Sequence, residues 1–232
     1  MANTTAKLLA AGAVLYAARR YFRDWGTTKD ESSRELPGDD LIAPPVLRAT
    51  EGVWIDAGAA AVWSWLVQMG QDRGGLYSFE KLENALGLHY RNADRIHPEW
   101  QHLGAGDTVR LVPRGWLGLA DGVELTVVRI VDGESIVLRG RQPALPWDLV
   151  WSFHVYPHWD DRCRLLIRSR LALRRPVDSI AAELIGPARA LVTRGILLGI
   201  KRRAQARPEA EKPAASPASG ATAAGAGFHR VV

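Results

Sequence analysis

The chain has 232 residues, of which 47% are hydrophobic and 24% charged, and its formal net charge is +5 at pH 7. These values exclude a large multidomain assembly and wholesale disorder, because a domain takes roughly 100 to 200 residues and this composition can build a core. A single cysteine, Cys163, excludes a disulfide framework within the chain and a multi-cysteine zinc site, which predicts a reducing compartment, the cytoplasm.

Residues 1–24 are predicted to form an apolar and basic N-terminal helix. The apolar run LLAAGAVLYAA at 8–18 would span roughly 17 Å as a helix, against about 30 Å for the hydrocarbon core of a bilayer. A membrane span is therefore not expected. Two interpretations stay open: an interfacial anchor in which Arg19, Arg20, Tyr21 and Phe22 contact the membrane, or a terminal helix that packs on the domain.

Composition divides the rest of the chain into three parts. Residues 24–40 hold six acids and two bases, so we interpret 25–45 as an acidic linker. Residues 46–205 carry strand-like and helix-like patterns and are predicted to form the ligand-binding domain. Residues 206–232 are rich in alanine, proline and glycine, and their small apolar content predicts a disordered tail.

Within the domain, a strand, two short helices, a series of strands and a long helix are expected in that order. The pattern at 46–55 is typical of a strand, and 59–69 and 78–86 have helical spacing. From residue 107 the apolar period becomes two, and Asp132-Gly133 is the strongest hairpin signal. Residues 178–203 return to helical spacing and end in basic residues.

This order predicts an α+β helix-grip fold. It is a curved antiparallel sheet of about six strands, with two short helices and a long C-terminal helix over its concave face. Because a straight helix cannot touch a curved sheet everywhere, an apolar cavity is expected between them. On the last strand, Arg164, Arg168 and Arg170 alternate with apolar residues, so we expect a solvent-facing stripe that serves solubility or meets phospholipid headgroups.

Several stretches resemble one known superfamily. The segments IDAGAAAVWSWLVQMGQDRGGLYSFEKLEN at 55–84 and ADRIHPEWQHLGAGDTVRL at 93–111, with WGTT at 25–28 and LPGDD at 36–40, are similar to a bacterial branch of the SRPBCC superfamily. This superfamily groups START-related and polyketide cyclase/dehydrase-like helix-grip proteins. The resemblance covers residues 25–200 and implies a cavity for a lipid, isoprenoid, polyketide or aromatic compound, but no particular reaction.

Large apolar side chains at inward positions are the candidates for the ligand site. We expect Tyr77 and Trp100 at its entrance. The predicted walls are Trp151 and Phe153 from the sheet, and Leu184 and Leu191 from the long helix. Each of these residues fits a solid core equally well, because an inward aromatic side chain is core by default.

A second group of side chains suggests acid–base chemistry at the rim of the cavity. His97, Glu99 and Tyr77 are the candidate catalytic residues, since a positioned side chain of these types can move a proton. The alternative is that they cap a loop. His154 and His158 belong to no recognisable zinc motif, so we predict no metal site and no cofactor.

We favour a noncatalytic protein that carries or senses a hydrophobic small molecule. One alternative is a cofactor-independent cyclase or dehydratase that uses the same cavity. The other is a membrane-peripheral module that contacts an anionic membrane surface, at the inner face of the membrane, through residues 1–23. Nucleic acid is not expected as a partner, because the basic strand face lacks interleaved aromatic residues. The sequence does not fix the oligomeric state.

Overall fold

A computed structural model of the protein describes residues 23–141, 147–173 and 179–206, together with residues 6, 7, 10, 12 and 14. In the last of the three ranges, side chains are described at residue 186 and from residue 188 onward. The predicted membrane contacts Arg19, Arg20, Tyr21 and Phe22 and the predicted tail beyond residue 206 lie outside the described residues.

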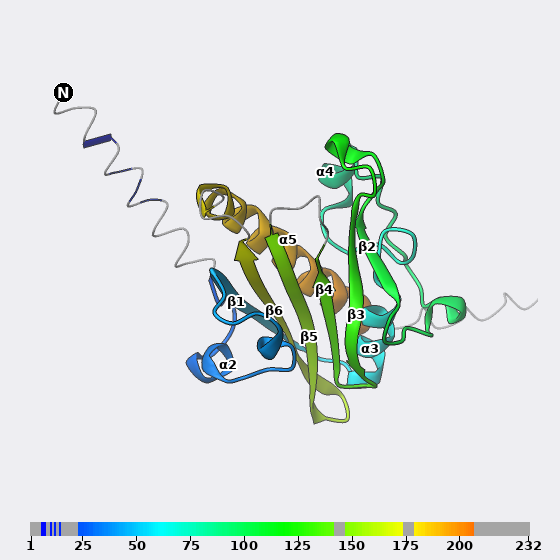
Figure 1. The fold of residues 1–232 in the computed structure, drawn as a ribbon. Coiled ribbons are helices and arrows are strands. Elements are labelled where there is room, and N and C mark those ends of the chain that lie inside the picture. The colour runs from blue at the N-terminus through cyan, green and yellow to red at the C-terminus, as the bar shows by residue number, and fades with distance from the viewer. Residues whose placement is uncertain are drawn as a thin grey trace, which may run out of the picture.

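Six antiparallel strands in the described ranges form one curved sheet (Figure 1). Their order is β1-β6-β5-β4-β3-β2, so the first strand of the chain pairs with the last. The predicted turn at Asp132-Gly133 joins β3 to β4, and Gly133 has the positive φ of 71° that such a turn requires. The strands are β1 Leu47–Ile55, β2 Thr108–Val112, β3 Val123–Val131, β4 Ser135–Gly140, β5 Trp147–Trp159 and β6 Arg162–Leu173.

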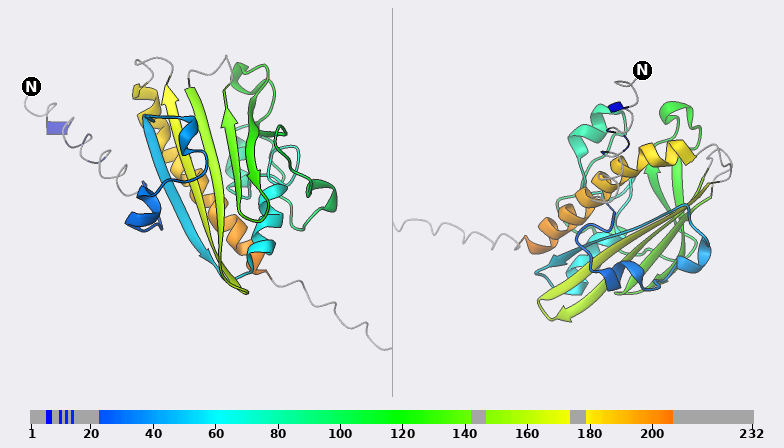
Figure 2. Two further views of the ribbon diagram at one scale, coloured as in Figure 1. Left: turned by 60° about the horizontal axis from the view of Figure 1, so that its bottom comes forward. Right: turned by 90° about the vertical axis from the view of Figure 1, so that its left-hand side faces the viewer.

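The long C-terminal helix crosses the concave face of the sheet beside α3, and α2 lies on the opposite, outer face (Figure 2). The helices are α2 Lys29–Ser33, α3 Ala59–Val67, α4 Glu80–Ala85 and α5 Ser179–Gln205, with short 3-10 turns η1 Asp39–Leu41, η2 Pro98–Trp100 and η3 Trp116–Gly118. This arrangement confirms the predicted α+β helix-grip fold. None of the helices in the described ranges is long and apolar enough to cross a bilayer.

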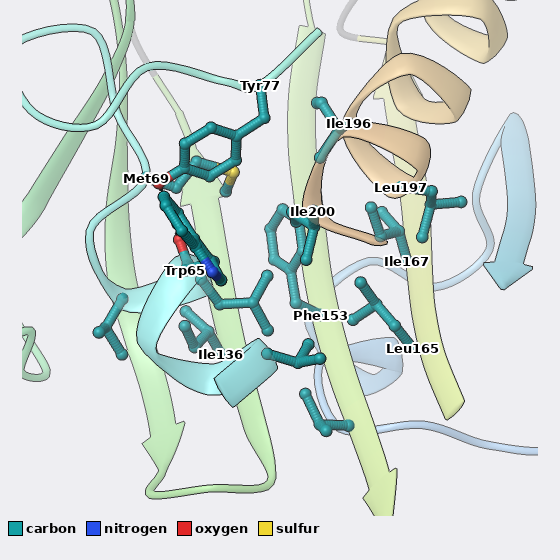
Figure 3. Packing of buried hydrophobic residues seen from close by; sticks show 14 of the residues in the cluster. Trp65, Met69, Tyr77, Ile136, Phe153, Leu165, Ile167, Ile196, Leu197 and Ile200 are labelled. Carbon is teal, nitrogen blue, oxygen red and sulfur yellow. Dashed lines mark hydrogen bonds between the residues drawn. The ribbon is translucent and has the colours of Figure 1, made fainter. Parts of the chain in front are cut away.

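The main hydrophobic core lies between the concave face and the C-terminal half of α5 (Figure 3). Phe153, Leu165 and Ile167 from the sheet and Ile196 and Ile200 from α5 are all fully buried. Since strand side chains alternate between faces, every second residue of β5 and β6 contributes to this layer. The C-terminal half of α5 is therefore fixed to the sheet by apolar contact.

A glycine in α5 lets a neighbouring loop lie directly on the helix. A Cβ atom at Gly199 would stand 1.9 Å from the carbonyl oxygen of Tyr77, which is sterically impossible. Tyr77 itself has a left-handed backbone, with a φ of 61°, and its N–H donates to Asn92 Oδ1 at 2.7 Å. The loop that carries Tyr77 is thus part of the core and adds a second anchor for this half of α5.

Residues 24–45 cover the outer face of the sheet. Arg164, Arg168 and Arg170 of β6 point into this segment and are 5%, 1% and 8% exposed. The predicted solvent stripe is therefore wrong: the alternation places the arginines opposite the core, but another part of the chain buries them. The segment expected as an acidic linker is the layer that supplies their partners.

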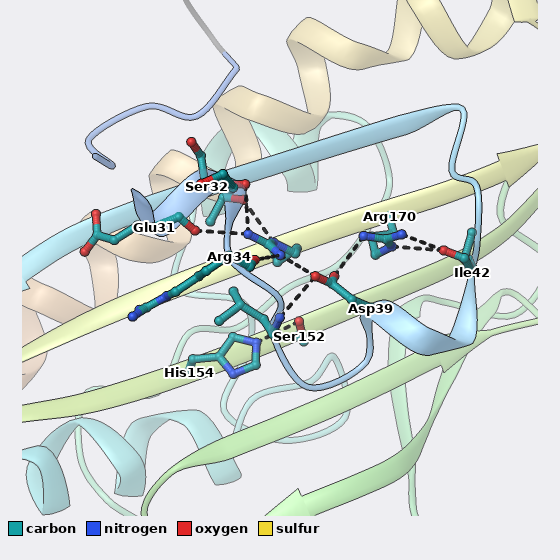
Figure 4. A network of polar contacts seen from close by, with 12 residues as sticks. Glu31, Ser32, Arg34, Asp39, Ile42, Ser152, His154 and Arg170 are labelled. Carbon is teal, nitrogen blue, oxygen red and sulfur yellow. Dashed lines mark hydrogen bonds and ion pairs between the residues drawn. The ribbon is translucent and has the colours of Figure 1, made fainter. Parts of the chain in front are cut away.

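Arg168 is bound by several groups of this layer, and Figure 4 labels four residues that supply them, Glu31, Ser32, Arg34 and Asp39. Its guanidinium pairs with the Asp39 carboxylate and donates to Thr50 Oγ1 at 3.0 Å. Asp39 also pairs with Arg170, whose Nη1 lies 3.1 Å from its Oδ1. The remaining donors of Arg168 reach the carbonyl oxygens of Glu31, Ser32 and Arg34 at 2.8 to 3.1 Å. Every guanidinium nitrogen of Arg168 thus has a partner.

Glu31 ties α2 to the sheet. Its carboxylate completes a capping box with Thr28 and accepts a hydrogen bond from Arg164 Nε at 2.8 Å. Burial opposes ionisation, but the hydrogen bonds from Arg164 and from the Thr28 N–H outweigh it and lower the pKa of Glu31. The Glu31 carboxylate is thus held ionised beside Arg164 of β6.

We expect Asp39→Asn to lower the free energy of unfolding by about 3 to 5 kcal/mol, because it removes the countercharge of a fully buried guanidinium. The matched control is Asp40→Asn. Asp40 is the next residue, but it pairs with Arg129 at the surface and its side chain is 61% exposed, so its loss should be much smaller. Urea unfolding followed by circular dichroism measures both, and equal losses would contradict this role for Asp39.

Candidate functional site

A buried carboxylate stands on the concave face, at the edge strand β1. Glu51 lies opposite Ile167 of β6, and strand alternation directs it toward α5, on the same side as Val53 and Ile55. Its side chain has no exposed surface. Within the described part of the chain, neither carboxylate oxygen has a hydrogen-bond partner.

Arg189 of α5 faces this carboxylate. Its Nη2 lies 2.9 Å from Glu51 Oε1, which is close enough for an ion pair but is not aligned as a hydrogen bond. Arg189 Nη1 donates to Ser169 Oγ at 3.3 Å and to Thr193 Oγ1 at 3.4 Å, while its Nε has no partner among the described residues. The pair therefore keeps an unused acceptor on Glu51 and an unused donor on Arg189.

Burial raises the pKa of Glu51, and the charge of Arg189 and its contact with the carboxylate only partly offset that effect. An ion pair taken out of water is stable only when hydrogen bonds satisfy its remaining polar atoms. Among the described residues this pair lacks such hydrogen bonds, which makes it the candidate for binding a further polar group.

Small and apolar side chains lie between the pair and one end of the sheet. Along β1 and β6 the facing pairs run from Glu51 and Ile167, through Ala49 and Ser169, to Leu47 and Leu171. At about 3.3 Å per residue, Leu47 is roughly 13 Å along the strand from Glu51. The first two pairs are buried, whereas Leu47 and Leu171 are only half-buried.

The same end of the sheet is half-open on its other strands. The inward residues Trp147, Leu149 and Leu173 are half-buried too, and the first half of α5 lies above this end in both views of Figure 2. Burial is thus complete under the C-terminal half of α5 and partial under the N-terminal half. The small side chains of Ala49 and Ser169 lie at the boundary between the completely buried and the partly buried part of the concave face.

The structure places the predicted ligand residues in different environments. Trp151 and Phe153 meet on the concave face, with ring centroids 4.9 Å apart, and both are buried. Trp100 lies in η2 and is half-buried. Leu191 is 46% exposed on the outward side of α5, so it does not face the sheet. The side chain of Leu184 lies outside the described residues.

Tyr77 was expected at the cavity entrance but lies inside the core. Its side chain is 1% exposed, and its hydroxyl donates to the carbonyl oxygen of Trp65 at 3.0 Å. Burial raises the pKa of Tyr77 to about 12, and the guanidinium of Arg203 lies 4.8 Å from the ring centroid. A neutral phenol with its proton committed to a carbonyl group is suited to packing rather than to proton transfer.

The other catalytic candidates gather at the η2 turn, near the surface. His97 Nδ1 lies 3.1 Å from Glu99 Oε1, and the His97 ring packs on Trp100 with centroids 4.2 Å apart. The Glu99 side chain is 63% exposed, and hydrogen bonds from its own backbone N–H and from His97 lower its pKa. The N–H of His97 donates to Gln68 Oε1 at 3.0 Å. This geometry is that of a capped loop, and a catalytic role for these residues stays a prediction.

The histidines of β5 belong to the packing of the outer face. His154 Nε2 lies 2.9 Å from Ser152 Oγ, and burial together with the charge of Arg168 lowers its pKa to about 4. His158 packs edge-on against Trp54. In the described ranges, no three His, Cys, Asp or Glu side chains are arranged to hold a metal ion.

Comparison with known proteins gives likeness in fold alone. No family model and no curated protein sequence matches the chain. Among solved structures, norcoclaurine synthase from Thalictrum flavum is 14% identical, with 70% of this chain and 95% of that chain covered and a TM-score of 0.43. The hypothetical protein jhp0584 from Helicobacter pylori is 13% identical, with 77% and 100% covered and a TM-score of 0.48. Membership of the SRPBCC superfamily stays a prediction, and the functional argument uses the residues of this chain.

Glu51 was missed as a site residue, although the sequence contains the signal. It occupies an inward position in the strand LRATEGVWI, in phase with Ala49, Val53 and Ile55. A carboxylate at such a position is rare without a function or a partner. Its partner Arg189 is 138 residues away in the chain, too far to be connected by pattern.

We expect Glu51 to make stability depend on pH in the opposite sense to an exposed, paired acid. Because its pKa is raised on folding, its contribution is most favourable below its unfolded pKa, near 4.3, and is lost as the pH rises through the folded value. The free-energy difference between wild type and Glu51→Gln, from urea unfolding, should therefore fall with rising pH. The pKa of Glu99 is lowered in the wild-type protein. The difference in free energy of unfolding between wild type and Glu99→Gln should therefore rise slightly with pH. A flat difference for Glu51→Gln would contradict the assignment.

Proposed function

We propose that the protein binds a hydrophobic small molecule, such as a lipid, isoprenoid or polyketide, between the concave face and the N-terminal half of α5, for carriage or sensing. The observation that carries this proposal is the buried pair of Glu51 and Arg189, whose polar atoms are incompletely satisfied beside half-buried apolar strand ends. An apolar site with a few convergent polar groups is the usual form of a small-molecule site.

The apolar part of the ligand would lie on the half-buried side chains at the end of the sheet. Leu47, Leu149 and Leu171 all face α5 and are only partly covered by protein. Covering this surface would contribute about 25 cal/mol per Å² of apolar area removed from water. The small, buried side chains of Ala49 and Ser169 stand between this end and the polar pair, so the polar end of the ligand would pass over them.

The polar part of the ligand would be a hydroxyl group. Glu51 offers an acceptor and Arg189 Nε offers a donor, and a hydroxyl is the simple group that donates and accepts at once. The pair carries no net charge, so a neutral ligand group leaves the local charge balance unchanged. A carboxylate would be repelled by Glu51, and an ammonium by Arg189.

Displacement of a fluorescent apolar probe, N-phenyl-1-naphthylamine, tests this proposal with three ligands of equal chain length. We expect 1-dodecanol to displace the probe better than dodecanoate or dodecylamine. In Glu51→Gln the affinity for dodecanol should fall about tenfold, because a hydrogen bond to a charged group is lost. The same variant should gain affinity for dodecanoate, since Arg189 then has no countercharge.

Two tryptophan substitutions locate the site. Leu171→Trp fills the half-buried end of the sheet and should abolish probe binding, whereas Val128→Trp, on an exposed residue of β3, should leave it unchanged. Circular dichroism establishes that both variants are folded. Probe binding that survives Leu171→Trp, or ligand preferences that Glu51→Gln leaves unaltered, would refute the proposed site.

A further inference from the structure

The outward side of α5 carries an apolar stripe. Leu191, Gly195 and Leu198 follow one another at positions i, i+4 and i+7, so they share one face of the helix. Leu191 and Leu198 are 46% and 44% exposed, although the opposite side of the same helix already fills the core. A helix of a globular domain normally presents charged residues on this side.

Helix α4 extends this stripe across the surface. The ring of Phe79 packs on Gly195, where a Cβ would stand 2.9 Å from Phe79 Cε2. Leu82 and Leu86 follow Phe79 at helical spacing, and the three residues are 47%, 61% and 60% exposed. We call the surface made by Phe79, Leu82, Leu86, Leu191 and Leu198 the α4–α5 face.

The charges that α5 carries beside the α4–α5 face are basic, although Glu80 and Asp94 lie near Arg203. Residues 184–206 contain arginines and a lysine but no acid, and exposed Arg202 continues the stripe of Leu191 and Leu198. On α4, Lys81 is exposed and Glu83 is buried, while half-buried Glu80 accepts a hydrogen bond from the Asn92 N–H. Apolar side chains with basic neighbours match the interface of an anionic bilayer, where leucines enter the acyl boundary and basic groups meet phosphates.

Trp25, which follows the N-terminal apolar run in the chain, lies beside the same face. Arg194, between Leu191 and Leu198 in α5, lies over the ring of Trp25 at 4.4 Å from its centroid. The apolar run at 8–18 precedes Trp25 in the chain, and Val14 within it is 68% exposed.

We infer that the α4–α5 face rests on the surface of anionic phospholipid bilayers. The contact is peripheral: Leu82 and Leu198 enter the interface, and the basic residues of α5 meet the headgroups. The arginines of β6, which the sequence had suggested for such a contact, are buried under residues 24–45 and take no part. The inference is independent of what the protein binds on its concave face.

Cosedimentation of the full chain with vesicles of phosphatidylglycerol and phosphatidylcholine tests the inference. Leu198→Glu and Leu82→Glu should each reduce the partition coefficient at least about tenfold. Each removes a leucine that the bilayer would bury and adds a negative charge that anionic lipids repel. The matched control is Trp159→Glu in the β5–β6 hairpin, which changes an apolar residue that is 67% exposed elsewhere. It should bind like wild type, and binding should weaken in pure phosphatidylcholine or high salt.

A positional probe gives a second readout that does not depend on weakened binding. The environment-sensitive fluorophore NBD on Leu198→Cys should shift to the blue when anionic vesicles are added, and NBD on Trp159→Cys should not. The native Cys163 is buried, and burial raises the pKa of its thiol to about 11, so it does not compete for the label.

Three outcomes would overturn the inference. The glutamate variants could bind vesicles like wild type, which would assign any binding to the N-terminal run alone. NBD at position 198 could show no shift on vesicles that do bind the protein. Light scattering could show a dimer that Leu198→Glu dissociates, without vesicle binding, which would make the face a contact between two copies of the chain.

Discussion

A charged pair held in an apolar interior is the constraint on which this structure depends. The sheet has such pairs on both faces, and they differ in how well they are satisfied. On the outer face, Arg168 uses its donors on Asp39, Thr50 and three backbone carbonyl groups. On the inner face, Glu51 meets Arg189, and neither carboxylate oxygen accepts a hydrogen bond from a residue that the structure describes. Asp39 keeps one oxygen, Oδ1, with an ion-pair contact to Arg170 but no hydrogen bond, whereas Glu51 lacks a hydrogen bond on both oxygens among the described residues. Because desolvation must be offset by hydrogen bonds, we propose that the Glu51 pair is the one that takes a further partner.

The two halves of α5 also differ in how completely the sheet beneath them is buried. In the C-terminal half, Ile196 and Ile200 are fully buried and Gly199 admits the Tyr77 loop, so this half is held firmly on the sheet. The N-terminal half lies over strand ends where Leu149 and Leu171 are only half-buried. In the function we propose, a small molecule binds under the N-terminal half of α5, where the strand ends are half-buried, and leaves the core under the C-terminal half undisturbed. In the further inference, the outward leucines of the same helix contact a bilayer, from which apolar molecules could come.

Much of the fold could be predicted from the sequence, because it follows from local periodicity. The alternation in residues 107–173 predicts antiparallel strands, and it also places Arg168 on the face opposite the core. What alternation cannot show is which segment covers that face, since the contact between Arg168 and Asp39 joins residues 129 positions apart. The acidic composition of residues 25–45 predicts an acidic linker, and its countercharges on β6 cannot be identified from the sequence because they are distant in the chain. The site was predicted less well, because the environments of Tyr77 and Leu191 depend on which elements pack against them.

Native mass spectrometry of the protein purified from its own host, followed by extraction with organic solvent, tests the central claim most directly. Wild type should carry an apolar molecule with a free hydroxyl group, and Glu51→Gln purified in the same way should carry much less of it. Wild-type protein without a copurified apolar molecule would contradict the account. So would a Glu51→Gln variant that retains the same molecule at the same occupancy.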